Sequence, residues 1–191
     1  MFILASKSPQ RKAILERLGV AFTVIPSDID EASSPEKDPV VRARLLAEMK
    51  AADVSRRFPD HWVIGVDTLV VASDGSLLEK PIDEEDARRM LRLHSGKVSI
   101  VHSALCLMKG EEHHTEVSSA RVTFKKFSED LMEWWIRCGL WRDRSGAFQI
   151  EGEGRKLVES VEGEYETVVG FPVQLFQMLC KDAHILYIVH Y

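Results

Sequence analysis

WVIGVDTLVV, residues Trp62–Val71, is the stretch that decides how this chain folds. Apolar side chains fill it almost without interruption, and its polar members are Asp67 and Thr68. A run of this kind predicts a central strand that is buried on both faces. An ionised carboxylate in a dry sheet costs roughly several kcal/mol unless it is paired or bound to a metal. Asp67 is therefore a candidate functional residue, with capping of a neighbouring turn as the alternative.

Strands and helices alternate on both sides of this run. Strands are expected at Phe2–Ala5, Phe22–Ile25, Trp62–Val71, Val98–Met108, Thr115–Phe124, Leu157–Val161 and Ile185–Val189. Helices are expected from Ser8 to Gly19, at Val40–Val54 (with Leu45, Met49 and Ala52 at helical spacing), and at Asp83–His94, Leu131–Cys138 and Pro172–Cys180. The alternation predicts an α/β protein with a mixed twisted sheet and flanking helices.

Composition narrows the class of protein. The 191 residues are 45% hydrophobic and 29% charged, which predicts a globular chain with one domain over residues 1–191. With 25 Lys and Arg against 30 Asp and Glu, the net charge of −5 argues against a nucleic-acid coat. No apolar run is long enough for a membrane span or a signal peptide. Cys106, Cys138 and Cys180 stand far apart, which indicates reduced, mostly buried thiols and a cytoplasmic protein.

The segment SKSPQRK, residues 6–12, follows the first expected strand and opens a helix. Free backbone N–H groups at the helix start, the hydroxyls of Ser6 and Ser8, and the guanidinium of Arg11 could together bind a phosphate. The alternative is a simple helix cap in which Ser8 accepts from the backbone and the basic residues are solvated.

Other candidate residues are weaker when taken singly. The acidic loop at 28–31, which ends in Glu31, could hold Mg²⁺ or Mn²⁺ or could be an ordinary solvated loop. Lys50 and Lys80 could contact phosphate or face solvent. Glycines at 143–154 would permit close backbone approach to a ligand, and Glu151 could read the edge of a base by hydrogen bonds.

Taken in order, these segments resemble the Maf family of nucleoside triphosphate pyrophosphatases. The resemblance rests on LASKSPQRK (4–12), DIDE (28–31), AEMKA (47–51), IGVDTLVV (64–71), LEKP (78–81), ARRMLRLHSG (87–96), DRSGAFQIEGEG (143–154) and VVGFPV (168–173). It implies an α/β fold of two lobes around a deep cleft, usually dimeric. It also implies hydrolysis of a noncanonical or modified nucleoside triphosphate between its α and β phosphates, giving the monophosphate and pyrophosphate.

The resemblance assigns roles residue by residue. Asp67 is the catalytic acid and shares a divalent metal, Mg²⁺ or Mn²⁺, with Glu31. The phosphate-binding residues are Ser6, Ser8, Arg11, Lys12, Lys50 and Lys80, and Gln10 and Glu151 take part in base recognition. The four cations and three acids in this set sum to +1, so we expect a locally positive cleft in an acidic homodimer that binds neither nucleic acid nor membrane.

Three positions depart from the family pattern. Gln10 stands where an arginine is common, Arg144 where a lysine is usual, and Glu151 where a glutamine is usual. Gln10 and Glu151 resemble the branch that acts on 7-methyl-GTP, because a glutamate can accept from both N1–H and the 2-amino group of guanine. Thr68 and Asp143 instead resemble the dTTP/UTP branch. We expect a slight preference for 7-methyl-GTP. The alternatives are a dTTP/UTP pyrophosphatase, a nucleotide-binding cell-division regulator with little hydrolysis, and an unrelated α/β phosphatase.

Overall fold

A computed structural model describes residues 1–31 and 34–186 of the chain. Among these residues, seven strands form one sheet in the order β2-β1-β3-β5-β6-β7, with β4 paired to β3. The strands are β1 (Phe2–Leu4), β2 (Phe22–Val24), β3 (Trp62–Val71), β4 (Leu77–Leu78), β5 (Val98–Lys109), β6 (Glu112–Phe124) and β7 (Val158–Glu162). β1 is parallel to β2 and β3, whereas β4 is antiparallel to β3 and β7 to β6. The predicted mixed sheet is confirmed.

The helices begin and end within two residues of their predicted bounds. They are α1 (Pro9–Arg17), α2 (Pro39–Ser55), α3 (Glu84–His94), α4 (Glu129–Cys138) and α6 (Val173–Asp182). A further helix, α5 (Tyr165–Val169), was not predicted, because a helix of five residues is too short to show a helical period. The glycine-bearing stretch at 143–154 contains a 3₁₀ turn, η2 (Ser145–Ala147), and a second one, η3 (Gly152–Lys156), begins within it.

The strand expected at Ile185–Val189 is not formed at the two residues of this range that the structure describes. Ile185 and Leu186 have no strand structure, and residues 187–189 lie outside the described residues. Along the described chain, no helix combines the length and apolar character that crossing a bilayer requires.

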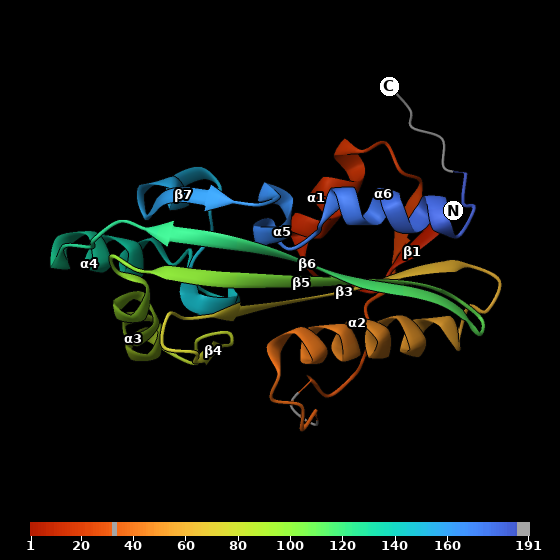
Figure 1. The fold of residues 1–191 in the computed structure, drawn as a ribbon, viewed down its shortest axis with the longest axis horizontal. Helices are drawn as coiled ribbons and strands as arrows, with labels where there is room; N and C mark the ends of the chain where they lie inside the picture. Colours follow the sequence, from red (N-terminus) through yellow and green to blue (C-terminus); the bar gives the residue numbers. More distant parts are fainter. Residues whose placement is uncertain (32–33, 187–191) are drawn as a thin grey trace. The chain divides into compact units, whose positions relative to one another are not determined.

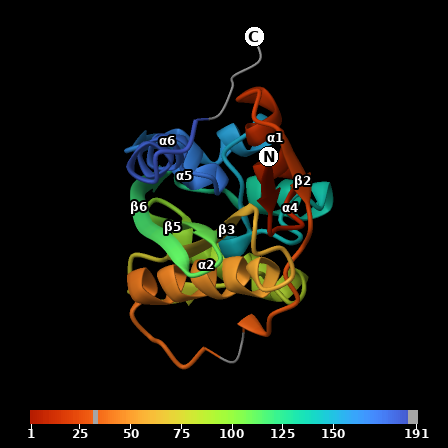
Figure 2. The same cartoon turned by 90° about the vertical axis from the view of Figure 1, so that its right-hand side faces the viewer.

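The chain divides into two compact units. The first contains residues 1–67, 103–118 and the chain from Gly170 onward, and the second contains residues 68–102 and 119–169. In the first unit, α1 and α6 lie on one side of β1 and α2 lies on the other (Figures 1 and 2). The rings of Phe2 in β1 and Phe176 in α6 meet edge to face at 5.6 Å. The single domain with two lobes and the cleft between them remain predictions.

The face that α2 buries differs from the predicted one. Leu45 and Met49 are exposed, by 38% and 37%, although their spacing predicted a core face. The buried face consists of Ala43, Leu46, Ala47, Lys50, Ala51, Val54 and Ser55. Gly65 of β3 explains this choice, because a Cβ there would overlap the Ala47 carbonyl oxygen and lie 2.8 Å from the Ala51 Cβ. The close approach selects the helix face with small residues, so hydrophobicity alone gave the wrong face.

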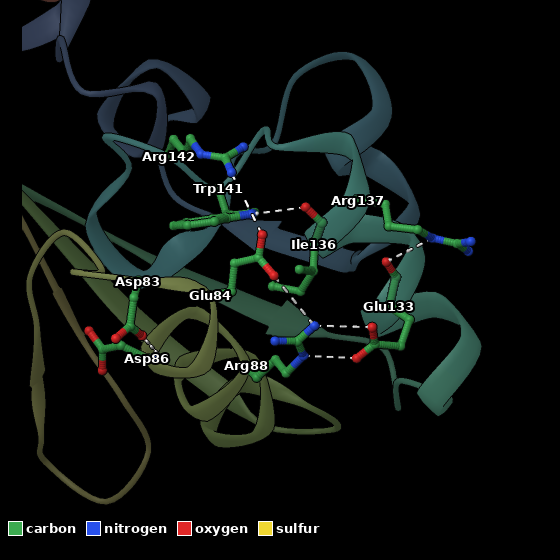
Figure 3. A network of polar contacts seen from close by, with 9 residues as sticks. All are labelled: Asp83, Glu84, Asp86, Arg88, Glu133, Ile136, Arg137, Trp141 and Arg142. Carbon is green, nitrogen blue, oxygen red and sulfur yellow. Dashed lines mark hydrogen bonds and ion pairs between the residues drawn. The ribbon is translucent and has the colours of Figure 1, made fainter.

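In the second unit, α3 and α4 pack on a core that includes Phe124, Trp135 and Leu157. A surface network of charged residues joins these two helices (Figure 3). Arg88 of α3 donates to both carboxylate oxygens of Glu133 in α4, at 2.8 and 3.1 Å. This fork geometry fixes the two helices side by side more specifically than single ion pairs would.

Candidate active site

The first group of candidate residues lies where β1 leads into α1, and all of it belongs to the first unit. Ser8 caps the helix with extended backbone, and Pro9 occupies the first helical position, as predicted. The Ser6 hydroxyl oxygen accepts from the backbone N–H of Ser8 at 3.2 Å and from Arg11 Nη1 at 2.9 Å. The Ser8 hydroxyl donates to Gln10 Oε1 at 3.1 Å. The structure therefore brings Ser6, Ser8, Gln10 and Arg11 together.

Arg11 is held in place from a distant part of the sequence. Its Nε donates to the carbonyl oxygen of Gly170 at 2.9 Å, across 159 residues of chain. Burial lowers the pKa of Arg11, and the opposing effect of the negative charges on Asp67 and Glu31 is smaller. An arginine remains charged even when its pKa is lowered in this way. The guanidinium is thus a fixed cation within electrostatic range of two carboxylates.

Lys50, Asp67 and Glu31 form the second group. Lys50 Nζ lies 2.6 Å from Asp67 Oδ1 and 3.0 Å from Glu31 Oε1. The Lys50 and Asp67 side chains are only 8% and 5% exposed, whereas the Glu31 side chain is 50% exposed. The lysine therefore joins a buried carboxylate to one that reaches solvent, and the solvated alternative for Lys50 is wrong.

Asp67 is the sixth of the ten residues in β3, so it lies in mid-strand rather than near the carboxyl end. Burial raises its pKa, and the positive charges of Lys50 and Arg11 oppose this rise. Among the described residues, Asp67 Oδ2 is buried without a hydrogen-bond partner. A buried oxygen without a partner is costly, so this atom is suited to bind a water, a substrate atom or a metal.

These donors can be compared with what a divalent ion requires. Within residues 1–31 and 34–186, no set of three histidine, cysteine or carboxylate groups gathers as a metal centre. Mg²⁺ is usually held by one or two carboxylates, and waters and substrate phosphates complete its coordination. Asp67 Oδ2 and the half-exposed Glu31 carboxylate supply two hard oxygen donors, so the residues present fit such an ion.

Two predicted phosphate contacts lie outside these groups. Lys12 is on the exposed side of α1, where its Nζ lies 3.6 Å from Glu16 Oε1. Lys80 belongs to the second unit and is exposed. Two cations, Arg11 and Lys50, thus face two acids, Glu31 and Asp67, and the formal charge of this cluster is zero. The predicted excess of +1 required Lys12 and Lys80, and it remains a prediction.

The second unit carries the loop with Glu151. This loop has left-handed backbone at Asp143 (φ 57°), Gly146 (φ 73°) and Ala147 (φ 60°). Such a conformation costs about 1–3 kcal/mol at a non-glycine residue and persists only where the surroundings hold it. Burial lowers the pKa of Arg144, and Glu151 and Asp143 oppose this effect, so Arg144 and Glu151 lie within electrostatic range of each other. The loop is therefore a strained segment that presents two charged side chains.

Comparison with known proteins decides the family. The model of a family described as Maf-like protein matches residues 1–183. The chain belongs to the Maf family. Among its Maf relatives, the dTTP/UTP pyrophosphatase of Pyrococcus furiosus is 40% identical over 184 residues, 95% of each chain. The enzyme of the same name from Treponema denticola is 38% identical over 193 residues, 94% of this chain and 95% of that one. The predicted family is confirmed.

Solved structures agree on the fold of this Maf chain. The Ham1 protein of Staphylococcus aureus has a TM-score of 0.51 at 11% identity, over 95% of this chain and 98% of that one. A HAM1 protein from Coxiella burnetii has a TM-score of 0.52 at 14% identity, over 94% and 98%. At these identities the likeness concerns the fold alone, and it confirms the expected α/β architecture with a mixed sheet.

Base preference is where the comparisons disagree with the sequence analysis. The Maf relatives above carry the name dTTP/UTP pyrophosphatase, which matches the stated alternative better than the preference for 7-methyl-GTP. The expected preference for 7-methyl-GTP gave more weight to Gln10 and Glu151 than to Thr68 and Asp143, and the comparisons do not confirm it. The structure ties Gln10 to Ser8 at the helix start, so its identity is constrained by local capping.

The sequence analysis of this Maf chain also missed residues that build the site. Gly65 admits the small face of α2 and so brings Lys50 to Asp67. The spacing of Ala43, Ala47 and Ala51, one residue in four, was a readable signal for this. The Gly170 carbonyl that binds Arg11 had no such signal, because its partner is 159 residues away.

Proposed function

We propose that the protein is a nucleoside triphosphate pyrophosphatase that hydrolyses dTTP and UTP to the monophosphate and pyrophosphate. One observation carries the proposal: a buried carboxylate, Asp67, has one oxygen held by Lys50 and the other without a hydrogen-bond partner among the described residues. Family membership and the names of the relatives support the reaction and the choice of pyrimidine nucleotides.

Asp67 acts as the general base. Its raised pKa makes the carboxylate a better proton acceptor than an exposed aspartate, and Oδ2 is the oxygen available to a water. The water oxygen bonds to the α phosphorus as its proton passes to Asp67, and the bond from the α phosphorus to the bridging oxygen breaks. Pyrophosphate leaves with that oxygen and its electron pair.

Arg11 and Lys50 stabilise the charge that develops on the leaving group. Both are held before any substrate binds, Arg11 by Ser6 and Gly170, and Lys50 by its two carboxylates. Cations fixed in this way need no reorganisation during the reaction, which is the main advantage of electrostatic catalysis. Ser6 and Ser8 add hydroxyl contacts at the helix start, where backbone N–H groups favour an anion.

We propose Mg²⁺ or Mn²⁺ as the cofactor, held by Asp67 and Glu31. When bound, it would neutralise phosphate charge and lower the pKa of the attacking water. We also propose a cytoplasmic homodimer, as the resemblance to the family implies. The exposed row of Val41, Leu45 and Met49 on α2 is a surface where a charged substitution can test association by light scattering.

A panel of dTTP, UTP, GTP and 7-methyl-GTP with each metal tests the proposal through pyrophosphate release. We expect dTTP and UTP to have the highest kcat/KM. Running the reaction in ¹⁸O-labelled water should place the label in the monophosphate, because the water attacks the α phosphorus. Binding without hydrolysis would favour a regulator, and inorganic phosphate as the only product would favour an unrelated phosphatase; either result would overturn the proposal.

A further inference from the structure

His94 is a buried imidazole that the proposed reaction does not use. It is the last residue of α3 and is fully buried. Its Nε2 lies 2.9 Å from the carbonyl oxygen of Gly146, and its Nδ1 lies 2.8 Å from the Ser99 hydroxyl. A carbonyl only accepts, so Nε2 carries the proton, and Nδ1 accepts from Ser99. Burial lowers the pKa of His94 to about 4, which keeps this neutral form near pH 7.

Neighbouring aromatic side chains fix the orientation of the His94 imidazole. The imidazole stacks on Phe124 with ring centres 4.3 Å apart and meets the edge of Phe148 at 5.1 Å. A Cβ at Gly146 would lie 3.1 Å from His94 Nε2. The ring is therefore aimed at the backbone of one turn, and a side chain at position 146 would crowd it.

The turn that His94 reaches is the strained segment 145–147. Three further contacts reach it from separate elements of the second unit: Ser145 Oγ donates to the Thr68 carbonyl, the Gly146 N–H to the Glu79 carbonyl, and Trp135 Nε1 to the Ala147 carbonyl. Positive φ at Ala147, which is not a glycine, needs such support from its surroundings. Arg144 directly precedes the turn and Glu151 follows it.

We propose that His94 is a positioning residue for nucleotide recognition: its Nε2–H bond to Gly146 sets the conformation of the loop that presents Arg144 and Glu151. This inference rests on the proposed function and on the expected role of Glu151 in base recognition. His94 contacts no reacting atom in this scheme, so its loss affects substrate binding more than the chemical step.

A matched pair of variants distinguishes the role of His94 Nε2 from that of Nδ1. The amide of His94→Gln reaches about as far as Nε2 and can still donate to Gly146, whereas the amide of His94→Asn ends near Nδ1 and cannot. With dTTP, His94→Asn should raise KM about tenfold with kcat within about threefold, and His94→Gln should stay within about threefold on both. Equal KM values for the two variants would overturn the proposal.

Two further variants control for stability and folding. Trp141→Phe removes a different buried hydrogen bond, from the indole N–H to the Ile136 carbonyl. It should leave KM unchanged. Ser99→Ala keeps the Nε2–H bond and should keep KM within about threefold, so the proposal stays testable if His94→Asn does not fold. An increase in KM in Ser99→Ala as large as about tenfold would contradict the role of Nε2.

Amide hydrogen exchange gives a readout that needs no activity. The Gly146 N–H donates to Glu79, so its exchange should accelerate in His94→Asn and not in His94→Gln. Equal exchange in both variants would overturn the positioning role. Absence of pyrophosphate release from the wild-type protein with every nucleotide would instead overturn the proposed function, and the two failures are distinguishable.

Discussion

Lys50 Nζ lies 2.6 Å from Asp67 Oδ1, and both side chains are buried. The pair is separated by 17 residues and joins α2 to β3. Removal of Lys50 takes away the ion-pair partner of a buried carboxylate, which is destabilising, whereas Lys50 keeps Glu31 as a partner if Asp67 is neutralised. Because Lys50 binds Oδ1, Asp67 Oδ2 is the oxygen left for the proposed reaction. Substitutions at this pair should therefore change both stability and activity.

The first prediction concerns the base. Asp67→Asn keeps the shape of the side chain and removes its capacity to accept a proton from water, so kcat should fall at least about 100-fold. Pyrophosphate release measures this, and circular dichroism checks that the fold is retained. Asp60→Asn, at an exposed acid outside the candidate site, is the control and should behave like the wild type. Near wild-type turnover in Asp67→Asn would refute the assignment.

The second prediction concerns Lys50. Its positive charge lowers the pKa of Asp67, so Lys50→Met should raise that pKa and move the acid limb of the kcat/KM profile to higher pH. The loss of one partner from a buried pair should also cost about 3 kcal/mol of unfolding free energy. Lys7→Met, at an exposed lysine, should change neither quantity. An unmoved acid limb in Lys50→Met would show that Asp67 does not control it.

The third prediction concerns pH and stability. His94 has a native pKa of about 4 against an ordinary value of 6.5, so the unfolded chain binds more protons between these values. The stabilisation is complete above about pH 6.5, declines as pH falls, and is lost below about pH 4, by about 3 kcal/mol in total. Urea unfolding over this range should show a shallower pH dependence for His94→Gln. Identical slopes would mean that another group is responsible.

The fourth prediction concerns Gly65. A methyl group at this position overlaps the Ala47 carbonyl oxygen, so Gly65→Ala must push α2 away from β3. We expect a loss of about 3 kcal/mol in unfolding free energy. Gly75→Asn serves as the control, because nothing lies within 4 Å of a Cβ there and asparagine tolerates its positive φ. A Gly65→Ala protein as stable as the control would contradict the close packing.

The fifth prediction concerns base preference. Glu151 offers only acceptors when ionised, whereas glutamine offers a donor and an acceptor and so matches the mixed edge of thymine or uracil. Glu151→Gln should therefore raise kcat/KM for dTTP relative to 7-methyl-GTP about tenfold. A competition assay with both nucleotides measures the ratio directly. Glu153→Gln, two residues along the same loop, should leave it unchanged.

Much of the fold could be predicted because its signals are local. The apolar run at Trp62–Val71 gave the central strand with its bounds, and Ser8 with Pro9 gave the start of α1. Such features depend on hydrophobic pattern and capping within a few residues. The spacing of Ala43, Ala47 and Ala51 indicates a face of small residues on α2, but the reason that this face is buried is Gly65, which lies on a different element.

The sequence by itself determined the family, the α/β class and the identity of the candidate groups, because ordered motifs and local propensities are written along the chain. Only the tertiary structure decided which of these groups meet. It buried Lys50 against Asp67, tied Arg11 to Gly170 and placed Lys12 on the surface beside Glu16. The reason is physical, because contacts between distant residues depend on how helices and strands pack. A helix that packs on a different face buries a different set of side chains.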